Sequence, residues 1–267
     1  MPFDATELMK RLSGVGLNHT GIVDVATYNA GVSPELHTDV LAPWARSILV
    51  FASGGSALWD ALLVDLRREP SHLTESDHPL DDFVHRSLAG VSDVFGGVEH
   101  RWIQASSNAD IHLDFRRLAV MAGLGSPSRL GLIIHPIFGP WMGLRAACFL
   151  PIELPVSAPI EDQCGDCPAP CVEACLGDAF VDGQWEVSRC ADFHRRSSQC
   201  AVDCDSRLAC PVGVEFRYPK DERGYHCDRA IGRKRMAQVL NIEGDYRKGI
   251  GPHWGGWSTP QKDSSSD

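Results

Sequence analysis

The sequence lacks a long apolar run and is poor in positive charge. No window approaches the ~20 apolar residues of a membrane-spanning helix, and residues 1–12 lack the basic and apolar regions of a secretory signal. Lysine and arginine number 25 against 35 aspartate and glutamate, which gives a net charge of −10 and argues against a large nucleic-acid surface. We therefore expect a cytoplasmic protein with no membrane contact and no nucleic-acid partner.

Several common chemical signatures are also missing. There is no glycine-rich dinucleotide or phosphate-loop pattern, no Ser/His/Asp or paired-carboxylate arrangement that spacing supports, and no internal repeat. The composition, with 43% hydrophobic and 22% charged residues, is that of an ordinary globular protein. At 267 residues, we expect one large core with an appended segment.

The pattern of apolar residues predicts a mixed α/β class. Residues 47–55 form a continuous apolar run that ends in glycines, and residues 57–69 repeat leucines at helical spacing, which indicates a strand followed by a helix. Another strand is expected over 98–106. Residues 129–136 and 144–152 are predicted to be paired central strands.

Composition shifts suggest three parts. A core domain is expected over residues 1–155, because the stretch 153–163 carries two prolines and no periodicity. A cysteine-rich segment follows over 160–218. The remainder, 219–267, is expected to hold one basic helix at 228–240 and a disordered tail.

Cysteines are concentrated in the middle segment, where eight of the ten lie between residues 164 and 210. The run CGDCPAPCVEAC has the spacing C-x2-C-x3-C-x3-C, close to the bacterial ferredoxin run. A chain of this size does not need disulfide staples, so we expect the cysteines to bind metal, as one or two 4Fe-4S clusters. Structural zinc is the alternative.

The cysteines are assigned in two sets of four, with Cys148 left as a core residue and Cys227 as a spare thiol. Cys210 is followed by proline, as is the last cysteine of a ferredoxin run. The predicted sets are Cys164, Cys167, Cys171 and Cys210 for one cluster, and Cys175, Cys190, Cys200 and Cys204 for the other.

Different parts of the chain resemble two different groups of proteins. The blocks YNAGVSPELH (28–37), ILVFASGGSALWDALL (48–63), DHPLDDFVHRSL (77–88) and GLIIHPIFGPWMGLRAACFLPIELPV (131–156) resemble the cobalamin-processing proteins of the cblC family. The cysteine region, together with AGLG (122–125), is similar to epoxyqueuosine reductases and reductive dehalogenases. These resemblances imply a nitroreductase-like α/β core that binds cobalamin, followed by a ferredoxin-like 4Fe-4S module.

The resemblance also implies where cobalamin would bind. Arg145 matches the arginine that lines the cofactor pocket of cblC proteins. The alternative is that Arg145 lies at the rim of the sheet and has no role in binding. The aromatic and glycine residues that follow His135 form a turn that suits a flat cofactor, or else a hairpin with a core tryptophan. The candidate cofactor-binding residues are Arg145, His135, Phe138, Gly139, Trp141 and Tyr28.

The function expected on this basis is an iron–sulphur cobalamin reductase that removes the upper ligand of cobalamin. Cobalamin would be its substrate, a ferredoxin or flavodoxin its electron donor, and flavin a further cofactor that the sequence leaves open. One alternative is a cobalamin-dependent reductase of another substrate, as in epoxyqueuosine reductases and dehalogenases. Another is a non-catalytic, ferredoxin-like electron carrier.

Overall fold

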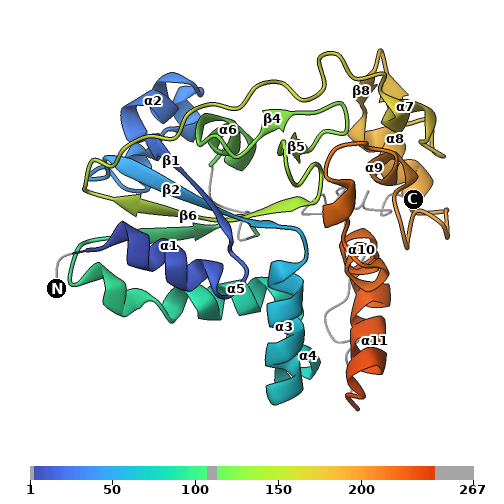
Figure 1. Cartoon of the computed structure of the whole chain (residues 1–267), viewed down its shortest axis with the longest axis horizontal. Helices are drawn as coiled ribbons and strands as arrows, with labels where there is room; N and C mark the ends of the chain where they lie inside the picture. The colour runs from blue at the N-terminus through green and yellow to red at the C-terminus, as the bar shows by residue number, and fades with distance from the viewer. Residues whose placement is uncertain (1–2, 107–112, 244–267) are drawn as a thin grey trace, which may run out of the picture.

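A four-stranded antiparallel sheet lies at the centre of the molecule (Figure 1). The computed structural model describes residues 3–106 and 113–243. The strand order is β1-β2-β6-β3, with β1 (His19–Asp24), β2 (Ser47–Gly54), β6 (Met142–Leu150) and β3 (Arg101–Gln104). Every residue of β2 is buried, as its continuous apolar sequence predicts for a strand covered on both faces.

Helices cover both faces of this sheet and confirm the mixed α/β class (Figure 1). The lower layer contains α1 (Ala5–Ser13), α3 (Ala57–Arg68), α4 (Ser71–Thr74) and α5 (Pro79–Ala89), and the upper layer contains α2 (Val25–Ala30) and α6 (Phe115–Met121). Short 3-10 turns span Pro34–Leu36, Thr38–Val40, Ser92–Phe95 and Val214–Phe216. Leucines of α1 and α3 pack on Leu49 and Phe51 of β2, so the apolar face of each helix closes the lower core.

The predicted pairing of two central strands is wrong. β5 (Ile133–Ile134) pairs with β4 (Ser126–Pro127) in a separate small sheet, and β6 pairs with β2 and β3 instead. Both edges of β6 are therefore already occupied. Between β5 and β6 the chain makes a tight turn, in which His135 and Gly139 exchange backbone hydrogen bonds and Gly139 has a φ of +58°.

The proline-containing linker after β6 runs along the free edge of β1. The backbone N–H of Ser157 donates to the carbonyl of Ile22 at 3.0 Å, and the N–H of Ile22 donates to Ser157 Oγ at 2.9 Å. Further on, the N–H of Gln163 donates to Ser126 Oγ at 3.1 Å. The linker thus covers the edge strand and delivers the cysteine segment to the opposite end of the sheet (Figure 1).

The cysteine segment folds into short elements beside the β4-β5 hairpin (Figure 1). They are α7 (Pro170–Glu173), β7 (Phe180–Val181), β8 (Gln184–Trp185), α8 (Val187–His194) and α9 (Asp205–Leu208). Leu130 and Ile134 of the hairpin pack against Cys171, Cys210 and Phe180. This small apolar cluster joins the segment to the core.

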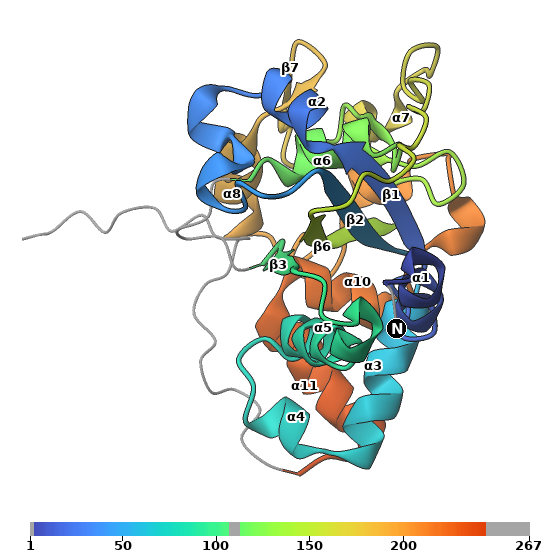
Figure 2. The same cartoon turned by 90° about the vertical axis from the view of Figure 1, so that its left-hand side faces the viewer.

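The C-terminal part forms a helical hairpin, of which the sequence indicated only the second helix. α10 (Lys220–Cys227) is followed directly by α11 (Arg229–Leu240), and Asp228 caps α11. A Cβ at Gly232 would lie 2.3 Å from Tyr225 Cα, so the two helices touch at their backbones. Tyr225 and Met236 join the lower core, and Figure 2 shows both helices beside α3 and α5.

Part of the basic stretch of α11 lies in the interior of the fold. Arg233 is fully buried and donates to the carbonyl of Leu73, and Arg229 pairs with Asp81 at 3.5 Å. The tail expected to be disordered, residues 258–267, lies outside the described residues. Within the described ranges, no helix is long and apolar enough to cross a membrane.

Replacing Gly139 tests the contact between the turn and the cysteine segment. A Cβ at Gly139 would lie 2.0 Å from the Val212 carbonyl oxygen, whereas one at Gly97, which also has positive φ, would meet nothing within 4 Å. Gly97→Ala should cost about 1–2 kcal/mol from backbone strain alone. Gly139→Ala should lower the unfolding midpoint clearly further, as measured by thermal denaturation. Equal losses would show that the contact contributes nothing.

Candidate metal centres

The structure gathers the eight clustered cysteines in two groups that match the predicted sets. Four of them line a small cavity of about 20 Å³ and are called the first quartet: Cys164, Cys167, Cys171 and Cys210. Four others line a larger cavity of about 270 Å³ and are called the second quartet: Cys175, Cys190, Cys200 and Cys204. Cys148 is buried in β6, away from both.

The first quartet is assembled by a loop and two short helices. The N–H of Cys164 donates to Asp162 Oδ1 at 2.9 Å, and the N–H of Cys167 donates to the Cys164 carbonyl at 3.3 Å, which closes the C-x2-C turn. Cys171 lies in α7 and Cys210 follows α9. Helix packing therefore brings Cys210 to the tight run from which it is far separated in sequence.

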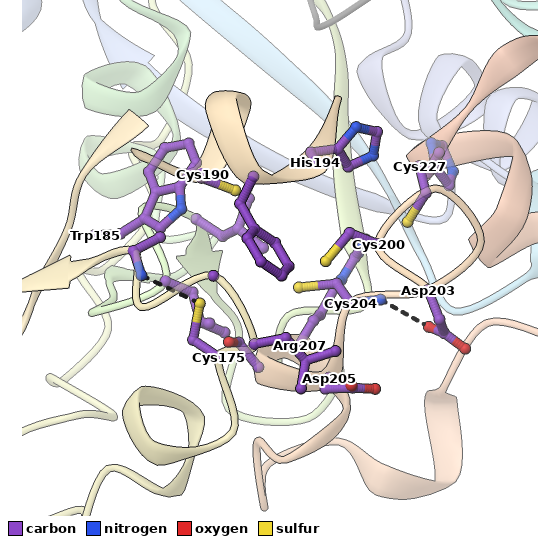
Figure 3. A pocket seen from close by; sticks show the side chains of 18 of the residues that line it. Cys175, Trp185, Cys190, His194, Cys200, Asp203, Cys204, Asp205, Arg207 and Cys227 are labelled. Carbon is purple, nitrogen blue, oxygen red and sulfur yellow. Dashed lines mark hydrogen bonds between the residues drawn. The ribbon is translucent and has the colours of Figure 1, made fainter. Parts of the chain in front are cut away.

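The second quartet surrounds the larger cavity (Figure 3). Cys175 follows α7, Cys190 lies in α8, and Cys200 and Cys204 come from the loop before α9. The N–H of Ala179 donates to Cys175 Sγ at 3.4 Å. The cavity extends from these sulphur atoms to the core side of the segment, where Trp141 lines it.

Electrostatics around both quartets suit a bound cation. Burial raises the pKa of Cys190 to about 11 and raises the pKa of Cys171 and Cys210, and the neighbouring thiols raise them further because each thiolate repels the next. A positively charged metal centre would remove this penalty. The donor set fits iron–sulphur chemistry, since each quartet offers only soft thiolates.

A single zinc ion is a poorer fit to the second quartet. Zinc holds four sulphur atoms at about 2.3 Å, so its ligands converge on one point. The second-quartet thiols instead line a cavity, which suits an extended cluster.

Arg145 lies where β6 departs from regular pairing. Phe51 pairs with Ala146 and Ala52 with Leu144, so Arg145 is the extra residue of a β-bulge. Its Nε donates to Ser53 Oγ at 3.0 Å. Bulges of this kind redirect a side chain, and the guanidinium is close enough to affect the titration of Glu222 on α10.

Glu222 is the most perturbed carboxyl group near this site. Its side chain is buried, with a residue exposure of 3%, and Oε2 has no hydrogen-bond partner among the described residues. Burial raises the pKa of Glu222 to about 8, although Ser56, Arg145 and Arg207 each lower it. One turn later, desolvation and nearby arginines hold the pKa of His226 well below its ordinary value.

The turn after β5 packs against the cysteine segment. His135 is buried, and its Nδ1 accepts from the N–H groups of Ile137 and Phe138. Burial, reinforced by His19, lowers the pKa of His135 to about 4. Phe138 contacts Phe216 with ring centroids 4.8 Å apart.

Trp141 is fully buried beneath Arg207 of α9. The Arg207 guanidinium lies 4.6 Å from the Trp141 ring centroid, and its Nε donates to the carbonyl of Pro140 at 3.1 Å. The same guanidinium lies 4.8 Å from the ring of Tyr218. These contacts hold the cysteine segment on the core.

The six predicted cofactor residues do not form one surface in this structure. Tyr28 is buried in the upper core, where its hydroxyl accepts from the Asp114 N–H at 3.0 Å, remote from the turn. His135, Gly139 and Trp141 are buried against protein, and Arg145 faces α10. Ligand pockets usually have volumes of about 300–1,000 Å³, so the 270 Å³ cavity is small for a corrin. The residues as placed do not fit that group.

Sequence reasoning missed several residues at the site. Arg207 stands between two cysteines in CDSRLAC (204–210), but nothing in its spacing marks it as the contact to Trp141. Glu222 and His226 lie on a helix that the apolar pattern did not indicate. Cys227 was noted only as a spare thiol, and the structure places it in the wall of the second-quartet cavity.

Comparison with known proteins links the chain to epoxyqueuosine reductases over part of its length. No family model matches. The epoxyqueuosine reductase of Staphylococcus aureus is 32% identical over 117 residues, which cover 43% of this chain and 27% of the relative. The match thus spans about a quarter of the relative.

Solved structures show a shared fold. Epoxyqueuosine reductase from Bacillus subtilis aligns over 80% of this chain and 66% of its own, with a TM-score of 0.55 and 19% identity. An epoxyqueuosine reductase structure with a modified tRNA-Tyr stem loop aligns with the same values. The B12-trafficking protein CblC of C. elegans aligns over 89% of this chain and 98% of its own, with a TM-score of 0.52 and 15% identity.

These findings correct the primary expectation. The cblC resemblance is not favoured over epoxyqueuosine reductase, since the curated relatives at 31–35% identity are all epoxyqueuosine reductases. One of the structures with the shared fold was solved with a tRNA stem loop, whereas the sequence led us to expect no nucleic-acid partner. Flavin receives no support from any of these relatives.

Glu222 should make stability depend on pH. Between pH 7 and 8 its carboxyl is ionised in the unfolded chain but largely protonated in the fold, because its pKa is raised from 4.5 to about 8. The folded state therefore holds an extra proton. As the pH rises, the free energy of unfolding should fall by up to about 1.4 kcal/mol per pH unit. Chemical unfolding at pH 7.0, 7.5 and 8.0 measures the slope.

Glu222→Gln should flatten this slope, because the amide does not titrate. Glu215→Gln, at an exposed position in the preceding 3-10 turn, is the matched control and should keep the parent slope. A Glu222→Gln variant with the parent's pH dependence would mean that Glu222 is ionised in the fold.

Proposed function

We propose that the chain is an iron–sulphur oxidoreductase of the epoxyqueuosine reductase type, with a 4Fe-4S cluster in each cysteine quartet. The observation that carries this proposal is the spatial grouping of eight cysteines, four around each of two cavities. In this proposal the mixed α/β region is a nitroreductase-like core and residues 160–218 are a ferredoxin-like module. Such clusters carry single electrons when bound.

The chain's own residues provide a short connection from the second quartet to the core. The cavity wall that holds the four thiols also includes Arg207 and Trp141. Arg207 bonds to Pro140 and stacks on Trp141, so the second quartet is separated from the core by one layer of side chains. We propose that electrons from a ferredoxin or flavodoxin enter at the cysteine segment and leave towards the core along this contact.

The proposed substrate is the epoxyqueuosine base of a tRNA stem loop. Support comes from the names of the curated relatives and from the structural neighbour with a modified tRNA-Tyr stem loop. The cysteine segment offers exposed arginines: Arg189 in α8, and Arg195, which pairs with Asp192, and Arg196 directly after that helix. Cobalamin is the cofactor proposed on resemblance, but the six expected residues do not present a surface for it.

Cobalamin processing is the second candidate function. One observation favours it: the fold of the C. elegans CblC structure aligns with this chain over 98% of its own length. In that case cobalamin would be the substrate, and loss of its upper ligand would be the reaction. The two candidates share the proposed clusters and differ in what receives the electrons.

Metal analysis tests the clusters. Anaerobically prepared protein should hold about eight iron and eight sulphide, Cys167→Ala and Cys175→Ala should each retain about half, and absorbance near 400 nm should fall in proportion. Cys148→Ala is the matched control, because Cys148 lies in β6 outside both quartets and should leave the iron unchanged. Zinc in place of iron would overturn the proposal.

Activity separates the two candidate functions. The full chain with cobalamin and a strong one-electron reductant should reduce epoxyqueuosine in a tRNA-Tyr stem loop, detected by mass spectrometry of the nucleoside, and Cys175→Ala should abolish this reaction. An unmodified stem loop controls for nonspecific change. Upper-ligand release from cobalamin, without change to the stem loop, would instead favour cobalamin processing.

A further inference from the structure

Cys227 is a thiol in the wall of the second-quartet cavity that neither predicted set includes. It is the last residue of α10 and lies 17 positions beyond Cys210 in sequence. Its side chain lines the same cavity as the second quartet. Figure 3 shows its sulphur on the side of the cavity where Cys200 and Cys204 lie.

The neighbours of Cys227 place it more closely. Cys175 and Cys190 line the same cavity, but Figure 3 shows them on the side opposite Cys227, with Cys200 and Cys204 between. Cys227 therefore stands beyond Cys204, on the side of the cavity away from Cys175.

The position of Cys227 is fixed by packing rather than by a loose loop. α10 packs on α11 with backbones in contact at Gly232, and Tyr225 packs on Trp59 with ring centroids 5.3 Å apart. The helix thus fixes this thiol beside the cavity before any metal binds. A preorganised thiol has little conformational entropy left to lose when it becomes a ligand.

A 4Fe-4S cluster takes four cysteine ligands, but five thiols line this cavity. We propose that Cys227 is a reserve ligand of the second cluster, which takes the corner of Cys204 when that thiol is removed. This inference rests on the proposed cluster in the second quartet. It also links α10, and through it the lower core, to the metal centre.

Anaerobic reconstitution of the full chain with iron and sulphide tests this proposal. Alanine variants are used, because serine can itself bind iron. Cys204→Ala and Cys227→Ala should each retain the parent's content of about eight iron, with a changed paramagnetic resonance spectrum of the reduced second cluster in Cys204→Ala only. Cys204→Ala with Cys227→Ala should fall to about four iron.

Cys175→Ala is the matched control. It removes a thiol of the same quartet that Cys227 does not neighbour, so it should lose about four iron whether or not Cys227 is present. Far-ultraviolet circular dichroism of each variant checks that the fold is kept. The double variant is repeated as Cys204→Ala with Cys227→Val, which fills the space of the thiol.

The outcomes separate this inference from the proposed function. If Cys204→Ala alone loses about four iron atoms, or if both double variants keep the iron content of the parent, Cys227 is not a ligand of the second cluster. Parent protein that binds zinc, or that holds iron only in the first quartet, would overturn the proposed second cluster itself. Full iron in Cys204→Ala and half in the double variants would support the reserve ligand.

Discussion

The guanidinium of Arg207 holds the cysteine segment on the core. It donates to the Pro140 carbonyl and lies over Trp141 and Tyr218, so one side chain joins the turn before β6, the start of α9 and the segment before α10. Trp141 is fully buried by these contacts. Because Arg207 follows Cys204 by three residues and precedes Cys210 by three, its position also sets where ligands of both quartets lie relative to the sheet.

The four-and-four grouping could be predicted from sequence, because it depends mostly on local spacing. The C-x2-C-x3-C run closes within a single loop and α7, and a Cys-Pro pair marks the residue that completes the first quartet. Cys227 could not be placed in this way. Its position depends on the contact between Gly232 and Tyr225 and on the packing of Tyr225 in the lower core. These are tertiary contacts that no local sequence pattern indicates.

The cofactor residues could not be placed from sequence for a related reason. An aromatic and glycine turn can present a flat surface to a ligand or to another part of the chain, and its sequence is the same in both cases. Gly139 permits close approach, but what approaches it is the carbonyl of Val212. Likewise, a β-bulge redirects the Arg145 side chain, as it could for a residue that contacts a ligand. Its charged neighbour, however, is Glu222 of α10 and not a ligand.

Net charge was a weak argument against nucleic acid, because it averages over the whole surface. Binding to phosphates depends on the cations that one face presents within about a Debye length, near 8 Å at physiological salt. In this chain the arginines of α11 are largely used inside the fold, where Arg233 bonds to Leu73 and Arg229 to Asp81. Arg189 of α8, and Arg195 and Arg196 directly after it, remain exposed on the cysteine segment. An acidic protein can therefore still offer a local basic face, and the face nearest the proposed clusters is the one to examine for tRNA contact.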